Sequence, residues 1–172
     1  MTQTAYFALG CFWGAERRFW QTEGVVETSV GYMGGTKQNP SYELVCTGTT
    51  GHAEAVKVIY DENVVSYRQL LEMFWTIHDP TQGNRQGNDI GSQYRSVIFY
   101  TNEEQKNEAL LTKDIYEKAI KNEGFDSITT EIIPAADHIY FEAEEYHQKY
   151  LKKNPNGYDC HARTGVFFPA GV

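Results

Sequence analysis

Three cysteines are the residues of this sequence best suited to nucleophilic or redox chemistry: Cys11, Cys46 and Cys160. An odd number of cysteines, in a chain that starts without a basic and then apolar export signal, disfavours a secreted disulfide scaffold. In a reducing compartment a thiol is a buried structural group, a metal ligand or a reactive nucleophile. The surrounding sequence has to decide among these three.

Cys11 has the setting of a nucleophile. It stands in Gly-Cys-Phe-Trp-Gly, residues 10–14, between a predicted strand and a helical pattern. At the first turn of a helix, unpaired backbone N–H groups and the helix dipole favour the thiolate. Phe12 and Trp13 would give the sulfur an aromatic wall suited to an apolar group such as a methyl. The alternative is a small buried hydrophobic residue, a common setting for a free cysteine.

Glu54 is the candidate acid. Residues 53–60 predict a half-buried strand, in which Val56 and Val58 face one side and Lys57 the other. Glu54 shares the parity of the valines, so we expect its carboxyl group on the apolar face. Burial there would raise its pKa and keep it protonated near neutral pH. The alternative is an exposed glutamate at the end of a strand.

The elements that must position these groups follow from periodicity and turn residues. Strands are predicted over residues 4–9, 25–32, 53–60, 96–100 and 128–133. Helices are predicted from residue 12, from 66 to near 80, from 102 to 120 and from 142 to 152. The third helix should bury Leu111, Ile115 and Ala119.

This order of elements predicts an α/β fold, an α+β two-layer sandwich with helices packed on a mixed sheet and a ferredoxin-like core. One domain is expected over residues 1–172. Within it, residues 154–172 should form a flexible, Gly-rich C-terminal tail that carries Cys160. Residues 81–94 satisfy neither period and predict a long loop, a feature that is often functional.

Charge and hydropathy exclude several function classes. The 172 residues carry 15 Lys and Arg against 23 Asp and Glu, a formal net charge of −8. Phosphate binding needs clustered positive charge, so we expect no nucleic acid and no membrane as partner. No apolar stretch approaches the roughly 18 residues of a membrane span. A cytoplasmic protein, and a monomer, is expected.

The segment at residues 10–14 resembles the active-site signature of the type A methionine sulfoxide reductases, the peptide-methionine (S)-S-oxide reductases. The resemblance continues in family order over nearly the whole chain, through GYMGG at 31–35, SY at 41–42, GHAEA at 51–55, GND at 87–89 and QYRS at 93–96. It implies reduction of methionine S-sulfoxide, free or in proteins, to methionine, and therefore repair of oxidised proteins.

The resemblance also implies roles for single residues. Cys11 would attack the sulfoxide sulfur and Glu54 would protonate the sulfoxide oxygen, while Tyr42 and Tyr94 would hydrogen-bond that oxygen. Asp89 would orient the active site and the substrate backbone.

Phe12 and Trp13 would form the pocket for the substrate methyl group. Without the resemblance these aromatic residues would be interpreted as packing residues, and Asp89 as a turn former.

The resemblance makes Cys160 the resolving cysteine, which condenses with the sulfenic acid of Cys11 to form a disulfide. Many family members carry a further tail cysteine, and this chain has none after Cys160. We therefore expect thioredoxin to reduce the Cys11–Cys160 disulfide directly. Cys46 follows Leu44 and Val45 and is predicted to be a buried structural thiol, with a resolving role as the alternative.

No metal and no organic cofactor is expected. Possible ligands are Cys46 with His52, Cys160 with His161, and Glu144 with His147. The paired spacings of zinc sites and di-metal bundles are missing, as are a dinucleotide-binding motif and a P-loop. Two other functions use the same residues: a thiol peroxidase acting on hydrogen peroxide, and a binding module that recognises oxidised methionine without chemistry.

Overall fold

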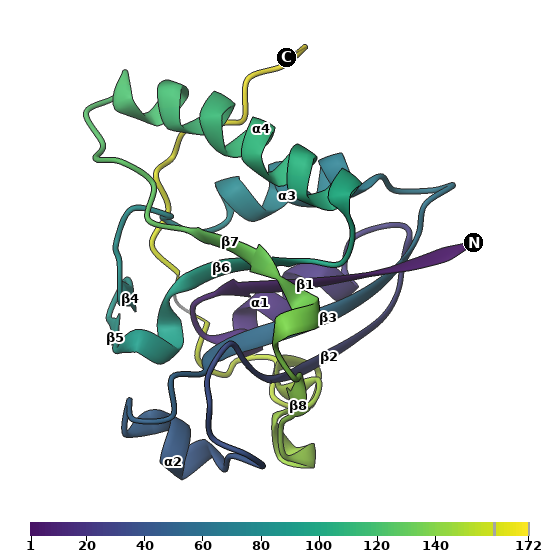
Figure 1. Ribbon diagram of the computed structural model, residues 1–172, viewed down its shortest axis with the longest axis vertical. Helices are drawn as coiled ribbons and strands as arrows, with labels where there is room; N and C mark the ends of the chain where they lie inside the picture. Colours follow the sequence, from purple (N-terminus) through teal and green to yellow (C-terminus); the bar gives the residue numbers. More distant parts are fainter. Residues whose placement is uncertain (160, 172) are drawn as a thin grey trace.

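A six-stranded mixed sheet forms the centre of the computed structural model, which describes residues 1–159 and 161–171 (Figure 1). Cys160, the predicted resolving cysteine, lies outside the described residues. The strand order is β7-β6-β1-β3-β2-β8, and only β6 and β7 pair in parallel. The strands are β1 Thr2–Leu9, β2 Val25–Met33, β3 Ala53–Asp61, β6 Ser96–Tyr100, β7 Glu131–Pro134 and β8 Phe141–Glu142. The predicted α/β fold with a mixed sheet and packed helices is confirmed.

The larger helices, α1 Phe12–Trp20, α3 Tyr67–Thr76 and α4 Glu103–Lys121, lie against one face of this sheet. Alternation along β1 explains why. Phe7 points to the helices, where its ring packs on Phe19 of α1 and Phe74 of α3, with ring centroids 5.0 and 5.4 Å away. Ala8 points to a smaller apolar cluster on the opposite face. The core therefore lies between the sheet and its helices, and α1 begins just after β1 ends.

Residues 142–152 do not form the predicted helix. They form the end of β8, a 3-10 turn η3 at Glu145–His147, and the short helix α5 Tyr150–Lys153. Lys149 adopts a left-handed backbone with φ of 53°, and its N–H donates to the Glu16 carboxylate at 2.8 Å. Bonds to distant residues therefore override the local helical pattern.

Residues 81–94 contain more structure than the predicted loop. They fold into a two-stranded ribbon, β4 Arg85–Gln86 with β5 Asp89–Ile90, followed by the 3-10 turn η1 Ser92–Tyr94. Gly87, with φ of 58°, makes the turn between the two strands. The ribbon and η1 together present Asp89 and Tyr94 on one short, folded segment.

The sequence missed one short helix, and it misplaced the buried side of α4. The sequence did not indicate α2, Tyr42–Cys46, which is capped by Ser41. The buried stripe of α4 runs through Ala109, Thr112, Tyr116 and Ile120, whereas Leu111 is 49% exposed. Leu111 lies one position away from Thr112, whose hydroxyl accepts a hydrogen bond from the Trp75 indole, and this bond places the polar residue inside.

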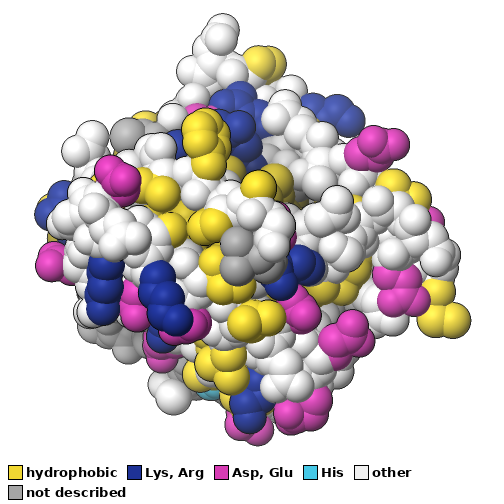
Figure 2. Space-filling model, turned by 90° about the horizontal axis from the view of Figure 1, so that it is seen from above, with side chains coloured by type: hydrophobic (Ala, Val, Ile, Leu, Met, Phe, Trp, Pro, Cys, Tyr) yellow, Lys and Arg dark blue, Asp and Glu magenta, His cyan; other side chains and the backbone are white. Residues whose placement is uncertain are grey.

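The surface carries charges of both signs. On the face seen in Figure 2, Lys and Arg side chains are interspersed with Asp and Glu. Across residues 1–159 and 161–171, no helix is both long enough and apolar enough to span a membrane.

Candidate active site

Every predicted site residue that the structure describes lines one small cavity of about 100 Å³. The cavity opens where β1 ends and α1 begins, and its wall also draws on α2, β3 and the β4-β5 ribbon. Its lining residues are Cys11, Phe12, Trp13, Tyr42, Glu54, Asp89, Tyr94 and Tyr158. Tyr158 is the one that sequence reasoning missed.

Cys11 occupies the N-cap position of α1 and is only 8% exposed. The backbone N–H groups of Trp13 and Gly14 at the helix start lower the pKa of its thiol, as the helix start predicts. Burial of the thiol, followed by the nearby Glu54 charge, outweighs these two backbone groups and raises the pKa of Cys11 well above its ordinary value. The expectation of a resting thiolate was therefore wrong, because desolvation exceeds the effect of the helix.

Glu54 lies on the helix-facing side of β3, with Val56 and Val58, and is 2% exposed. One carboxylate oxygen, Oε1, accepts a hydrogen bond of 3.1 Å from the backbone N–H of Phe12. Burial raises the pKa of Glu54 to about 8; the Phe12 hydrogen bond lowers it, and the Asp89 charge raises it further. Glu54 is therefore protonated at neutral pH and can give up a proton inside the cavity.

The aromatic wall is held from the C-terminal segment. The Trp13 indole N–H donates to Nδ1 of the buried His147 at 3.0 Å, and the Trp13 ring stacks on Tyr150 at 3.8 Å. His147 also lies against the Phe12 ring, with centroids 5.2 Å apart. The two predicted pocket aromatics thus share one histidine as a support.

The phenols of Tyr42 and Tyr94 line the same cavity as Glu54. Glu144 holds Tyr42 in place: the backbone N–H of Tyr42 donates to its Oε2 at 2.9 Å. The hydroxyl of Tyr32 donates to Oε1 of the same carboxylate at 2.8 Å. Burial raises the pKa of Tyr42 and of Tyr94 above the ordinary value. Both phenols therefore keep their protons and can donate hydrogen bonds.

Cys46 lies at the end of α2 and is exposed, so the prediction that it is buried was wrong. Its thiol hydrogen-bonds the phenol of Tyr42, one helical turn earlier. An apolar neighbourhood in the sequence did not mean a buried thiol, because α2 is a short helix on the surface.

Asp89 is connected to the tail. The Tyr158 hydroxyl donates to its Oδ1 at 2.9 Å, while Oδ2 is buried and has no partner among the described residues. A carboxylate oxygen in this position can accept a hydrogen bond from a ligand. The only sequence signal for Tyr158 is its position two residues before Cys160.

Glu144 and His147, which were considered as metal ligands, each hold a different part of the aromatic site instead. Within the described part of the chain, no group of three or more His, Cys, Asp or Glu side chains is placed to hold a metal ion. Their E-x-x-H spacing places both on η3 and the residue before it.

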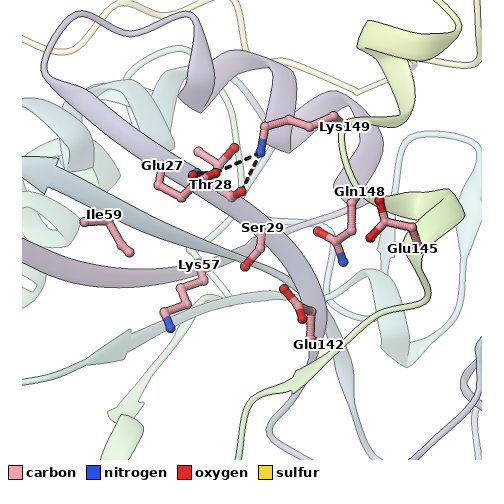
Figure 3. A pocket seen from close by; sticks show the side chains of 9 residues that line it. All are labelled: Glu27, Thr28, Ser29, Lys57, Ile59, Glu142, Glu145, Gln148 and Lys149. Atoms are coloured by element: carbon pink, nitrogen blue, oxygen red, sulfur yellow. Dashed lines mark hydrogen bonds and ion pairs between the residues drawn. The ribbon is translucent and has the colours of Figure 1, made fainter.

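A second hollow of about 340 Å³ contains none of the predicted residues (Figure 3). It is lined by Glu27, Thr28, Ser29, Lys57, Ile59, Glu142, Glu145, Gln148 and Lys149. Lys149 forms an ion pair there with Glu27. Because the hollow lacks a thiol and a buried acid, the cavity at Cys11 is the candidate active site.

Comparison with known proteins identifies the family of the chain. A family model described as peptide methionine sulfoxide reductase matches residues 3–168. Peptide methionine sulfoxide reductase MsrA of Pseudomonas entomophila is 58% identical, over 98% of this chain and 75% of that protein.

Two solved structures are similar over most of the chain. Methionine sulfoxide reductase A of Corynebacterium diphtheriae has a TM-score of 0.89 at 46% identity, covering 99% of this chain and 82% of that one. Reduced Mxr1 from Saccharomyces cerevisiae has a TM-score of 0.83 at 37% identity, covering 94% and 92%. With the family model matching nearly every residue, this chain belongs to the peptide methionine sulfoxide reductase family.

Proposed function

We propose that this chain reduces methionine S-sulfoxide to methionine, free or in proteins, with Cys11 as the nucleophile and Glu54 as the proton donor. The observation that carries the proposal is the buried, protonated Glu54 beside the Cys11 thiol in one small cavity. Membership of the family makes the chain a peptide-methionine (S)-S-oxide reductase.

In the first half of the cycle the Cys11 sulfur attacks the sulfoxide sulfur. The oxygen needs a proton as it moves to Cys11, and Glu54 supplies it while Tyr42 and Tyr94 donate hydrogen bonds to that oxygen. Methionine leaves, and Cys11 remains as a sulfenic acid. The two electrons come from the Cys11 sulfur, so the residues of the cavity suffice for this step.

The cavity suits a small thioether group. Phe12 and Trp13 offer an apolar wall for the methyl group, and the same lining includes the acid and the phenols. The cavity therefore offers groups for both the apolar and the polar end of a methyl sulfoxide. Asp89, with a buried unpartnered oxygen, can accept a hydrogen bond from the substrate backbone.

In the second half, the Cys160 thiol attacks the sulfenic sulfur of Cys11, a disulfide forms and water leaves. Thioredoxin then reduces the disulfide by thiol exchange. In support, the yeast relative Mxr1 has been crystallised in complex with Trx2. Repair of oxidised proteins would be the consequence.

We further infer that the scaffold beneath the site is ferredoxin-like. The four central strands run in the order β6-β1-β3-β2, and α1 and α3 connect them in a β-α-β-β-α-β sequence. This topology supports the inference because it places the end of β1, and hence Cys11, next to Glu54 on β3.

One experiment tests the proposed cycle. Methionine S-sulfoxide is added to the fully reduced protein without reductant, and lost thiols and released methionine are counted. The reductase should release one methionine and lose two thiols, whereas a binding module would lose none. A thiol peroxidase would lose thiols to hydrogen peroxide and ignore the sulfoxide.

The Cys160→Ser variant identifies the resolving cysteine. It should still release one methionine but lose only one thiol. Loss of two thiols would instead assign the resolving role to Cys46, whose exposed thiol lies one helical turn from the cavity residue Tyr42.

A further inference from the structure

The chain on both sides of Cys160 is fastened to the elements that surround Cys11. Before it, Tyr158 donates to Asp89 of the β4-β5 ribbon at 2.9 Å. Asp159 forms an ion pair and hydrogen bond with Arg17 of α1. After it, His161 has a side chain only 6% exposed and its Nδ1 is 3.8 Å from Oδ1 of Asp159. We call Arg17, Asp159 and His161 the tail clamp.

The clamp is seated on the first turns of α1. A Cβ atom on Gly14 would overlap Oδ1 of Asp159, and it would come within 3.1 Å of the His161 ring. A Cβ atom on Gly10 would come within 3.1 Å of His161 Nε2. Both glycines bracket Cys11 in the sequence, so their missing side chains let the tail approach the start of the helix.

Electrostatics favour the closed clamp. Interaction with the nearby His161 side chain, followed by hydrogen bonding and charge attraction from Arg17, lowers the pKa of Asp159 to about 2, against the opposing effect of burial. Asp159 is therefore ionised at neutral pH, where it can pair with Arg17. The same arginine donates to the backbone oxygen of Pro155 at 3.4 Å, which ties it to the chain upstream as well.

We propose that Arg17 and Asp159 are positioning residues for disulfide formation: their ion pair holds the segment that carries Cys160 against the N-terminal turn of α1 and so speeds the attack of Cys160 on oxidised Cys11. The inference rests on the proposed function, in which Cys160 is the resolving cysteine. Holding two reacting groups on one surface raises their effective concentration.

Disulfide formation is a condensation of a thiol with a sulfenic acid. The Cys160 sulfur forms a bond to the Cys11 sulfur, the S–O bond of the sulfenic acid breaks, and the oxygen leaves as water with the thiol proton. Cys160 is oxidised and Cys11 is reduced to the disulfide level. None of the three clamp residues lines the cavity, so changing the clamp should leave the first half of the cycle unchanged.

The test follows both halves of one turnover by rapid quenching, with reduced protein, methionine S-sulfoxide and no reductant. Methionine release reports the first half and loss of the second thiol reports disulfide formation. In Arg17→Gln, methionine release should stay within about twofold, while disulfide formation slows by about tenfold or more, as a lost effective concentration requires. Arg18→Gln, which removes the same charge from the next helix position, is the matched control.

The clamp also predicts how substitutions combine. Asp159→Asn should slow disulfide formation as much as Arg17→Gln, and the double variant should be no slower than either, because both remove one interaction. Gly14→Ala should slow the same step by displacing Asp159, and Arg17→Lys should restore part of the rate. Additive losses would show that the two residues act separately and would overturn the proposal.

The outcomes separate this inference from the proposed function. If wild-type protein loses one thiol only, or if Cys160→Ser still loses two, the resolving role of Cys160 is wrong and the clamp loses its purpose. If wild type behaves as proposed and Arg17→Gln forms the disulfide at the wild-type rate, the clamp alone is wrong. A variant that releases methionine at the normal rate has folded, so slow disulfide formation cannot come from misfolding.

Discussion

Burial sets the proton content of the cavity. It raises the pKa of both Cys11 and Glu54, so at neutral pH the pair holds two protons. The proposed reaction needs a Cys11 thiolate beside a protonated Glu54, a form of the pair that holds one proton. A Cys11 thiol beside an ionised Glu54 also holds one proton. Loss of the first proton therefore belongs to the pair and not to either residue alone.

The pH profile of kcat/KM follows from this pairing. The rate constant should rise as pH approaches about 8, where the first proton leaves the pair, since the pKa of Glu54 is about 8. It should fall again above the raised pKa of Cys11, where the acid is also lost. Measuring kcat/KM for methionine S-sulfoxide from about pH 6 to about pH 10 gives the two limbs.

Substitution of Glu54 should change that profile in a specific way. Glu54→Gln should lose the alkaline fall, because its amide does not titrate, and it should retain some activity by hydrogen-bonding the oxygen. Glu54→Ala should lose about 10²-fold to 10⁴-fold, the usual contribution of a positioned acid. Wild-type activity in Glu54→Ala would remove the proposed role.

The same carboxyl should cost stability. A carboxyl whose folded pKa is raised holds its proton more tightly in the folded state, so unfolding becomes easier as pH rises from about 4.5 towards about 8. Glu54→Gln should therefore unfold at higher urea concentration than wild type at pH near 8, since each pKa unit is worth about 1.4 kcal/mol. The two proteins should converge near pH 4, and an equal difference at both pH values would contradict this origin.

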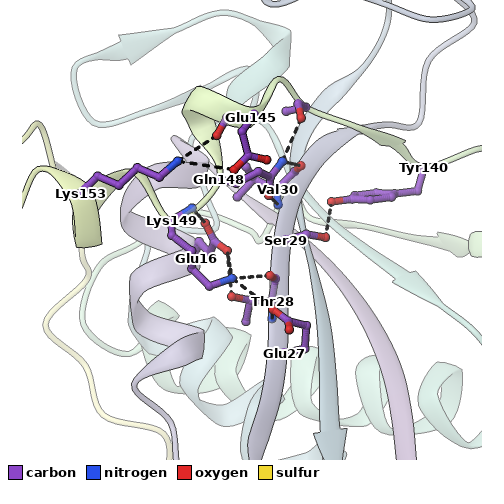
Figure 4. A network of polar contacts seen from close by, with 11 residues as sticks. Glu16, Glu27, Thr28, Ser29, Val30, Tyr140, Glu145, Gln148, Lys149 and Lys153 are labelled. Atoms are coloured by element: carbon purple, nitrogen blue, oxygen red, sulfur yellow. Dashed lines mark hydrogen bonds and ion pairs between the residues drawn. The ribbon is translucent and has the colours of Figure 1, made fainter.

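At the scale of elements, the segment from β8 to α5 depends on one buried carboxylate. Glu16 of α1 is 0% exposed and accepts from the Thr28 hydroxyl, the Lys149 N–H and the Lys149 ammonium group, at 2.8, 2.8 and 3.0 Å. Figure 4 shows these bonds converging between α1, β2 and the segment. Because the segment also carries Glu144 and His147, Glu16 supports the aromatic wall from a distance.

Removing Glu16 should therefore be costly. Glu16→Ala leaves a partly buried Lys149 and several polar groups without their partner, and we expect a loss of about 3 kcal/mol in the free energy of unfolding. Glu27→Ala removes an ion-pair partner of the same Lys149, but the Glu27 side chain is 65% exposed, and we expect less than about 1 kcal/mol. Urea denaturation of both variants checks the contrast, and equal losses would show that burial of Glu16 is irrelevant.

The sequence predicted the elements that local patterns determine, and it failed where contacts with distant residues determine the structure. Periodicity indicated the central strands and large helices because alternation and capping are local; Ser66, for example, caps α3, where Gln69 completes a capping box. The helix expected over residues 142–152 failed because Lys149 and Gln148 bond to Glu16 and Val30, more than 100 residues away.

The residues of the site also differ in whether a local pattern or only the fold places them. Strand parity sufficed to place Glu54 on the buried face, since one local pattern determines it. Tyr158 and His147 carry no local pattern of their own, and only the fold brings them to Asp89 and Trp13. The direction of the Cys11 pKa also needed the fold, because the helix start is visible in the sequence and the degree of burial is not.

At the scale of the whole molecule, the tail connects the active site to α4. Past His161 the chain crosses towards α4 in Figure 1. The buried Tyr116 of α4 donates from its hydroxyl to the Val166 backbone oxygen at 2.8 Å, and its ring stacks on Phe168 with centroids 6.0 Å apart. This anchor shares the tail with the clamp but lies on the other side of Arg163.

Tyr116→Phe should loosen this anchor while keeping the stacked ring. Losing the hydroxyl removes hydrogen bonds to Val166 and Thr164, a loss of about 1 kcal/mol, which is roughly a fivefold change in the population of the released tail. Trypsin cleavage after Arg163 should therefore quicken about fivefold when opening is faster than cleavage, because the rate then follows the open population.

Mass spectrometry of the cleaved ends under native conditions measures this rate, and Tyr100→Phe, which removes a phenolic hydroxyl from the half-buried end of β6, is the matched control. An unchanged rate in Tyr116→Phe would mean that the tail is held by Phe168 and the clamp alone, and faster cleavage in both variants would indicate general destabilisation.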